Sequence, residues 1–126
     1  MPDQKTVLCI DDNASNLRLL EGMFKARKHL NVLSASTSEE GLALALTHQP
    51  DLILLDISMP HLDGYEVLAR LRQHATLART PIVAVTAKAQ LLDRMKGLAL
   101  GFTDYVTKPV DVQNLLGQVD RLLSSD

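Results

Sequence analysis

Residues 52–56 read Leu-Ile-Leu-Leu-Asp, four consecutive apolar side chains that end in a carboxylate. A strand with one face in water alternates apolar and polar residues, whereas a strand of a parallel sheet is covered by helices on both faces and is apolar throughout. The run therefore predicts a central strand of a parallel sheet at Leu52–Asp56. Pro50, just before it, ends the preceding segment without removing a hydrogen bond from the strand.

Similar short apolar runs recur on both sides of this strand and alternate with longer stretches of helical periodicity. The other strands are predicted at Thr6–Ile10, Asn31–Ala35, Ile82–Thr86 and Asp104–Thr107, and the helices near residues 14–28, 38–48, 64–74, 90–100 and 111–123. Right-handed crossovers between such strands place helices on both faces of the sheet. We therefore expect an α/β fold, a single doubly wound (βα)5 sandwich around a parallel five-stranded sheet.

Two helix starts carry a capping signal. Asp111 precedes the most strongly periodic helix, and Ser38 stands before the second helix, so both are predicted to be N-cap residues. The periodic apolar positions of the last helix are Val112, Leu115, Leu116, Val119, Leu122 and Leu123. Their spacing predicts one apolar face directed at the sheet.

Composition limits the function classes. The chain has 126 residues, enough for one domain, which we expect to span residues 1–126 with a core of about 5–123. Lys and Arg number 13 against 15 Asp and Glu, a formal net charge of −2, and no basic block occurs, so nucleic-acid binding is not expected. Cys9 is the only cysteine and lies in an apolar run, which predicts a buried hydrophobe and no internal disulfide.

Neither a membrane span nor a signal peptide is predicted. No apolar run approaches the ~20 residues that a spanning helix needs, and the polar start Met1-Pro2-Asp3-Gln4-Lys5 is not followed by the apolar core of a signal peptide. We therefore expect a cytoplasmic protein.

Polar side chains follow the predicted strands at the points where the strands end. Asp11 and Asp12 follow the first strand, Asp56 ends the third, Thr86 ends the fourth and Lys108 follows the fifth. In open α/β sheets the ligand crevice lies beyond the carboxyl ends of the strands, at a topological switch point. These five side chains are therefore expected to meet at one edge of the sheet.

The charges at that edge favour a cation. Carboxylates ~5 Å apart repel each other by ~3 kcal/mol at an effective dielectric constant of about 20. Lys108 supplies one positive charge, and Mg²⁺, which binds carboxylates and phosphate oxygens, is suited to supply the rest. Asp11 and Asp12 are neighbours and suited to hold the metal, whereas Asp56 stands alone and is the better nucleophile for an acyl phosphate. A lone aspartate at a strand end also serves as a turn residue, which is the structural alternative.

Four pieces of sequence together resemble the signature of response-regulator receiver domains. They are Asp11-Asp12, the run Asp56-Ile57-Ser58-Met59-Pro60-His61-Leu62-Asp63-Gly64, Thr86-Ala87 and Lys108-Pro109. The resemblance covers essentially the whole chain in order and spacing, and it implies the strand order 2-1-3-4-5.

The resemblance also implies a role for each residue around the phosphate. Asp56 would be the phosphoacceptor, and Lys108 would contact the phosphoryl oxygens. Asp12, Asp56 and the backbone carbonyl of Ser58 would bind Mg²⁺ directly, and Asp11 would act mainly through water. The site would therefore form an aspartyl phosphate with Mg²⁺ as its cofactor.

A switch is implied as well. Thr86 would move toward the phosphate and donate a hydrogen bond, and Tyr105 would turn inward into the vacated space. Independently of the resemblance, a phosphoryl group adds about −1.5 to −2 charge and strong acceptor oxygens. Such a charge can bias a two-state surface. A half-buried strand aromatic is the plain alternative for Tyr105.

As a receiver domain, the chain would act in two-component signalling or a phosphorelay. It would take its phosphoryl group from a histidine kinase or a histidine phosphotransfer protein and switch a downstream protein target, as a monomer or weak dimer. No DNA-binding output domain and no metabolic enzyme activity are expected, only self-catalysed phosphorylation and dephosphorylation.

Three rival functions share parts of this pattern. A haloacid dehalogenase-type phosphatase needs two acids spaced two residues apart after its first strand, whereas Asp11 and Asp12 are adjacent. A flavin-binding module needs a loop that cradles phosphate with backbone N–H groups, and two aspartates would repel that phosphate. A degenerate receiver that only binds partners would lack some of the acceptor, metal, threonine and lysine positions, all of which are filled.

Overall fold

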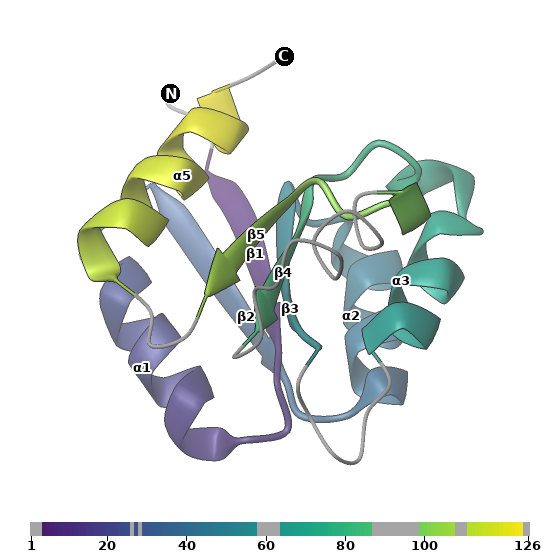
Figure 1. Ribbon diagram of the computed structural model, residues 1–126, viewed down its shortest axis with the longest axis horizontal. Coiled ribbons are helices and arrows are strands. Elements are labelled where there is room, and N and C mark those ends of the chain that lie inside the picture. The colour runs from purple at the N-terminus through teal and green to yellow at the C-terminus, as the bar shows by residue number, and fades with distance from the viewer. Residues whose placement is uncertain are drawn as a thin grey trace.

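The computed structural model describes residues 4–25, 27, 29–57, 64–86, 99–107 and 111–124. Along the chain the elements are β1 (Lys5–Ile10), α1 (Ala14–Lys25), β2 (Leu30–Ala35), α2 (Ser38–His48), β3 (Leu52–Asp56), α3 (Gly64–Arg72), a 3-10 turn (Ala75–Leu77), β4 (Ile82–Thr86), β5 (Asp104–Thr107) and α5 (Val112–Ser124). The strands form one parallel sheet in the order β2-β1-β3-β4-β5 (Figure 1). This confirms the doubly wound α/β sheet and its predicted strand order.

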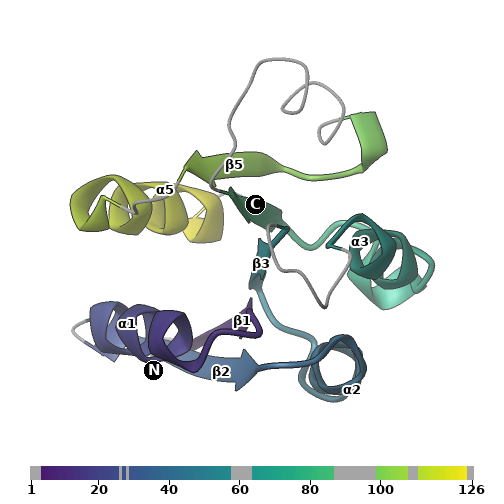
Figure 2. The same cartoon turned by 60° about the horizontal axis from the view of Figure 1, so that its bottom comes forward.

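Helices cover both faces of the sheet and create two cores. Figure 2 shows α1 and α5 on one side of the sheet and α2 and α3 on the other. Val7 and Cys9 of β1 belong to the core with α1 and α5, whereas Leu8 and Ile10 belong to the core with α2 and α3. All five residues of β3 are buried, as predicted for a central strand.

The strands begin and end close to their predicted limits, but two helices are shorter than predicted. The predicted helix 14–28 ends at Lys25, and the N–H of Arg27 donates to the carbonyl of Phe24 at 2.9 Å, a tightened turn that ends the helix. The predicted helix 64–74 ends at Arg72 and leads into the 3-10 turn. The predicted helix 90–100 lies mainly outside the described residues.

The cap of α2 lies one residue earlier than predicted. Thr37 is the N-cap: its backbone is extended, with φ −133° and ψ 160°, and its side chain accepts a hydrogen bond from the N–H of Glu40 at 3.1 Å. Ser38 is therefore the first helical residue and not the cap. The prediction for α5 is correct, because Asp111 Oδ1 accepts from the N–H of Asn114 at 3.1 Å.

The apolar face of α5 packs on the sheet as its spacing predicts. Leu115 and Val119 are buried, whereas Leu116, Leu122 and Leu123 are half-buried against the same core. Val112, at the start of the helix, is exposed. In the parts of the chain that the structure describes, no helix combines the length and the apolar character needed to cross a bilayer.

Candidate functional site

The candidate site begins with two buried carboxylates on neighbouring strands. Ile10 of β1 is paired with Leu55 of β3, and the next residues along the two strands are Asp11 and Asp56. Both aspartates are only 3% exposed. β1 and β3 lie on either side of the point where the strand order reverses, because the chain goes from β1 outward to β2 and then to β3 on the other side. This is where ligands bind in open α/β sheets.

Local hydrogen bonds fix the loop that carries Asp11 and Asp12. The N–H of Asp11 donates to the carbonyl of Ala35 at 3.0 Å, and Asp11 Oδ1 accepts from the N–H of Asn13 at 2.9 Å. Asn13 Oδ1 in turn accepts from the N–H of Asn16 at 3.1 Å, so Asn13 caps α1. Asn13 therefore both donates a hydrogen bond to the carboxylate of Asp11 and caps α1. Asp12, the residue between them, is half-buried.

Asn13 was not among the predicted site residues. An asparagine directly before a helix is a recognisable N-cap signal, and that signal could have identified it. Its bond to Asp11 could not be read from the sequence, because it depends on how the loop turns after β1.

Thr86 lies one position beyond Asp56 on the next strand. Asp56 is paired with Val85, and Thr86 is paired with Thr107 of β5. Thr86 is 3% exposed. Because side chains alternate along a strand, Thr86 shares the face of Ala84 toward α2 and α3, while Asp56 shares the face of Leu54 toward α1 and α5.

Tyr105 lies on the same face of the sheet as Thr86. It is paired with Ala84, two residues before Thr86, and it is 7% exposed. Its ring centroid lies 5.9 Å from that of Phe102. The structure therefore places Tyr105 inside the core rather than half-buried at the rim of β5.

Two predicted site residues cannot be placed. Lys108 would follow Thr107, and Ser58 would follow Ile57, but both lie outside the described residues. The structure therefore brings together Asp11, Asp56 and Thr86 at one end of the sheet.

A close contact next to Asp56 was not predicted from the sequence. Gly64, the first residue of α3, packs against Ile57, the residue after Asp56. A Cβ atom on Gly64 would lie 2.8 Å from the Cα of Ile57, closer than real Cβ atoms approach, and would also clash with its Cγ2. The glycine is therefore needed for the start of α3 to reach the end of β3.

The donors at this end of the sheet fit a hard cation. Carboxylate oxygens are the ligands that Mg²⁺ prefers, and the carboxylates of Asp11 and Asp56 are both buried at the ends of neighbouring strands. Carboxylates placed so deeply are stabilised by nearby positive charge. No group of three or more His, Cys, Asp and Glu side chains among the described residues is arranged to hold a metal. The predicted ligand set includes the carbonyl of Ser58, which is outside them.

Cys9 is not a ligand candidate. Burial, together with the smaller effects of the negative charges of Glu21 and Asp11, raises the pKa of its thiol from 9.0 to about 12. Because the thiolate is the metal-binding form, this thiol stays neutral and acts as a core residue, as predicted. The histidines at positions 29, 48 and 74 are all exposed, consistent with solvated surface residues.

Comparisons with known proteins point to one family. The family model of the response regulator receiver domain matches residues 7–120. The chain is 36% identical to Protein PilH of Pseudomonas aeruginosa over 118 residues, which cover 94% of this chain and 97% of PilH. It is 40% identical over 119 residues to the alkaline phosphatase synthesis transcriptional regulatory protein PhoP of Bacillus subtilis, covering 94% of this chain but 48% of PhoP.

A solved structure is similar over nearly its full length. The receiver domain of the sensor histidine kinase PA1611 from Pseudomonas aeruginosa has a TM-score of 0.86 and 30% sequence identity, and the match covers 97% of this chain and 99% of that one. That structure has a magnesium ion coordinated in its active site cleft.

Proposed function

This chain belongs to the response regulator receiver domain family of two-component signalling, and on that basis we propose that Asp56 is its phosphoacceptor. The single observation that carries the proposal is the pair of buried carboxylates, Asp56 and Asp11, that follow neighbouring strands at the switch point of the sheet. Asp56 ends a strand whose five residues are all buried, whereas Asp11 and Asp12 lie on the loop after β1, where the N–H of Asn13 donates to Asp11 Oδ1.

In the proposed reaction a carboxylate oxygen of Asp56 attacks the phosphorus atom of a phosphohistidine on a kinase or phosphotransfer protein. The new P–O bond forms as the P–N bond breaks, and the histidine nitrogen leaves with the electron pair of that bond. Phosphoryl transfer depends mainly on positioning and on neutralising charge. The rigid end of β3 supplies the positioning, because every residue of that strand is buried.

In this proposal, Mg²⁺ and Lys108 would neutralise the negative charge of the phosphoryl group. The residues that would hold Mg²⁺ are Asp11, Asp12, Asp56 and the carbonyl of Ser58, and the bound ion would offset the charge of the incoming phosphoryl group. Lys108 would contact its oxygens. Thr86, buried at the end of β4 and one position beyond the residue paired with Asp56, would donate its hydroxyl hydrogen to the phosphate.

Acetyl phosphate provides the test without a cognate kinase. Incubation with acetyl phosphate and Mg²⁺ should raise the mass of the intact protein by about 80 Da, and a chelator should abolish the increase. Asp56→Asn should remove the adduct. The matched control is Asp51→Asn, because Asp51 lies at the opposite end of β3 and its Oδ2 accepts from the N–H of Thr6 at 2.8 Å, a role that an amide oxygen also fills.

The mass measurement also tests two alternative interpretations, and an assay with small phosphate esters tests a third. An adduct that persists in Asp56→Asn would mean that another carboxylate is the acceptor. No adduct in the parent protein would favour a degenerate receiver that only binds partners. Sustained release of phosphate from small phosphate esters would favour a phosphatase.

A further inference from the structure

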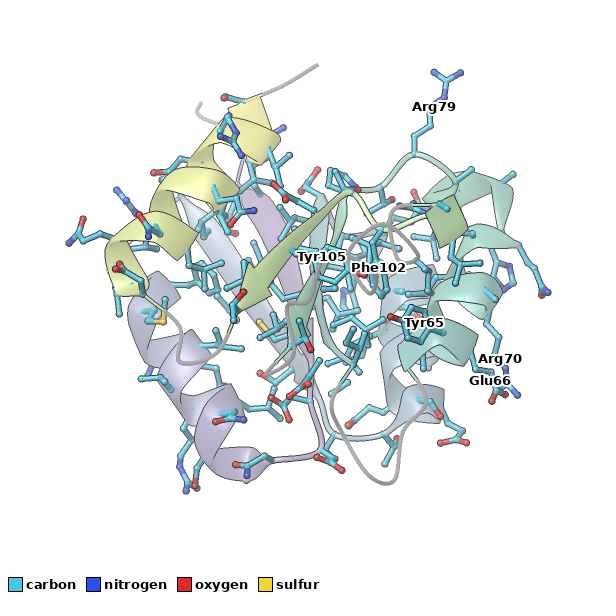
Figure 3. All side chains as sticks on the ribbon, in the orientation of Figure 1. Tyr65, Glu66, Arg70, Arg79, Phe102 and Tyr105 are labelled. Atoms are coloured by element: carbon cyan, nitrogen blue, oxygen red, sulfur yellow. The ribbon has the colours of Figure 1, made fainter. Side chains whose placement is uncertain are left out.

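Three aromatic rings form a continuous row between α3 and β5. The ring centroid of Phe102 lies 5.9 Å from that of Tyr65, edge to face at 70°, and 5.9 Å from that of Tyr105 on the other side. Figure 3 shows the three side chains following one another from α3 to β5. The chain has two Tyr, two Phe and no Trp, so this row contains all of these rings except Phe24, which lies in the core on the opposite face of the sheet.

The three rings differ in burial, and Tyr65 is the least buried. Phe102 and Tyr105 are buried, at 3% and 7% exposure, whereas Tyr65 is half-buried. Protein interiors are packed without spare volume, so a ring that moves displaces the ring it touches. Phe102 contacts both neighbours, and Tyr65 is the ring of the three that is most exposed to water. A movement of Tyr105 is therefore passed through Phe102 to Tyr65.

Both ends of the row border the candidate site. Tyr105 is paired with Ala84 and lies on the same face as Thr86. At the other end, Tyr65 directly follows Gly64, which packs against Ile57 beside Asp56. The row therefore connects the strand that carries the switch tyrosine to the helix that starts against the acceptor strand.

We infer that Phe102 and Tyr65 are positioning residues that hold Tyr105 in its inward position and carry its movement to the first turn of α3. The inference rests on the function proposed above, since phosphorylation of Asp56 is what would bias Tyr105. Coupling of this kind is reciprocal. A partner that binds the exposed side of Tyr65 would therefore also change how strongly the phosphorylated form is favoured.

The two tyrosines make the coupling directly observable. Protein with isotopically labelled tyrosine rings has only two tyrosine ring environments, which Tyr65→Phe and Tyr105→Phe assign by removing one each. In the parent, beryllofluoride with Mg²⁺ should shift the resonances of both tyrosine rings, and the two shifts should depend on beryllofluoride concentration in the same way. In Phe102→Leu, which keeps an apolar side chain but removes the middle ring, the Tyr65 shift should fall to less than half while Tyr105 still responds.

The other phenylalanine provides the matched control. Phe24→Leu removes an equally buried ring from the opposite core, so both responses should remain as in the parent. A Tyr65 response that persists in Phe102→Leu would overturn the inference and assign the signal to the backbone contact between Gly64 and Ile57. A parent in which Tyr105 responds and Tyr65 does not would overturn it as well.

Failure of the proposed function looks different. In that case the parent takes up no phosphoryl group from acetyl phosphate and neither tyrosine responds, which would remove the basis of both the function and the inference. A phosphoryl adduct with no tyrosine response would leave the phosphoacceptor proposal standing and overturn the aromatic coupling alone.

Discussion

The guanidinium of Arg72 donates two hydrogen bonds to the carbonyl oxygen of Gly101, at 2.7 Å from Nη2 and 3.2 Å from Nε. Its Nη1 donates to the carbonyls of Leu77, Ala78 and Thr80, at 2.9, 3.3 and 2.6 Å. One side chain thus joins the end of α3, the turn before β4 and the segment that enters β5.

Loss of this side chain should destabilise the fold. Arg72→Met leaves several partly buried carbonyls without their donor, and we expect the free energy of unfolding to fall by about 2 to 4 kcal/mol in urea titrations. Arg72→Lys should restore less than half of the loss, because a single ammonium cannot reach both sets of carbonyls.

Arg70 on the same helix is the control. Its Nη2 lies 2.7 Å from Glu66 Oε1, in an exposed pair four residues apart. Arg70→Met should therefore cost only about 0.3 to 0.5 kcal/mol. Equal losses for the two variants would show that the carbonyl contacts of Arg72 contribute nothing beyond an ordinary surface arginine.

A methyl group on Gly64 should disturb the site as well as the fold. Its Cβ would meet the backbone of Ile57 next to Asp56, so Gly64→Ala should destabilise the protein by about 1 to 3 kcal/mol and reduce the yield of the phosphoryl adduct. Gly117→Ala on α5 is the control, because nothing lies within 4 Å of its Cβ position. That change should stabilise the helix by up to about 1 kcal/mol. A neutral result for Gly64→Ala would mean that α3 starts away from β3.

The buried thiol should make stability depend on pH at the alkaline end. The pKa of Cys9 is raised from 9.0 to about 12, so the folded protein keeps its thiol neutral where the unfolded chain loses the proton. The contribution to stability is full below pH 9.0 and is lost as the pH rises toward about 12.

The contribution of Cys9 to this pH dependence is the difference in unfolding free energy between the parent and Cys9→Ala at each pH. Over this range the parent should lose stability more steeply than Cys9→Ala, by up to about 1.4 kcal/mol per pH unit. Thiol reagents should modify native Cys9 only as fast as the protein unfolds. Identical pH slopes for the two proteins would contradict the assigned burial of the thiol.

The cap of α2 can be tested with two neighbouring hydroxyl residues. Thr37→Ala removes the acceptor for the N–H of Glu40 and should cost about 1 kcal/mol of unfolding free energy. Ser38→Ala should cost almost nothing, since Ser38 is already helical. A larger loss of unfolding free energy for Ser38→Ala than for Thr37→Ala would show that Ser38 is the N-cap.

The same two residues also show that the exact position of a helix cap could not be predicted from the sequence. Thr37 and Ser38 carry the same capping chemistry, and only the extended backbone of Thr37 decides between them. By contrast, the apolar run at Leu52–Asp56 had one consistent interpretation, and the strand was found where it was predicted.

The candidate site also contains some features that could be predicted from the sequence and others that could not. Asp11 and Asp56 could be placed together from sequence, because parallel strands bring their carboxyl ends to one edge. The packing of Phe102 between Tyr65 and Tyr105 could not, because it depends on which faces of α3 and β5 meet in three dimensions. The contact between Gly64 and Ile57 likewise depends on the path between β3 and α3.

The central claim is that Asp56 itself carries the phosphoryl group, and locating the acyl phosphate tests this most directly. Borohydride reduction after treatment with acetyl phosphate and Mg²⁺ converts a phosphorylated aspartate to homoserine, which peptide mass spectrometry can assign to one position. We predict homoserine at position 56 in the parent and at no other aspartate. Homoserine at position 11 or 12, or at no position despite a mass increase of the intact protein, would contradict the account.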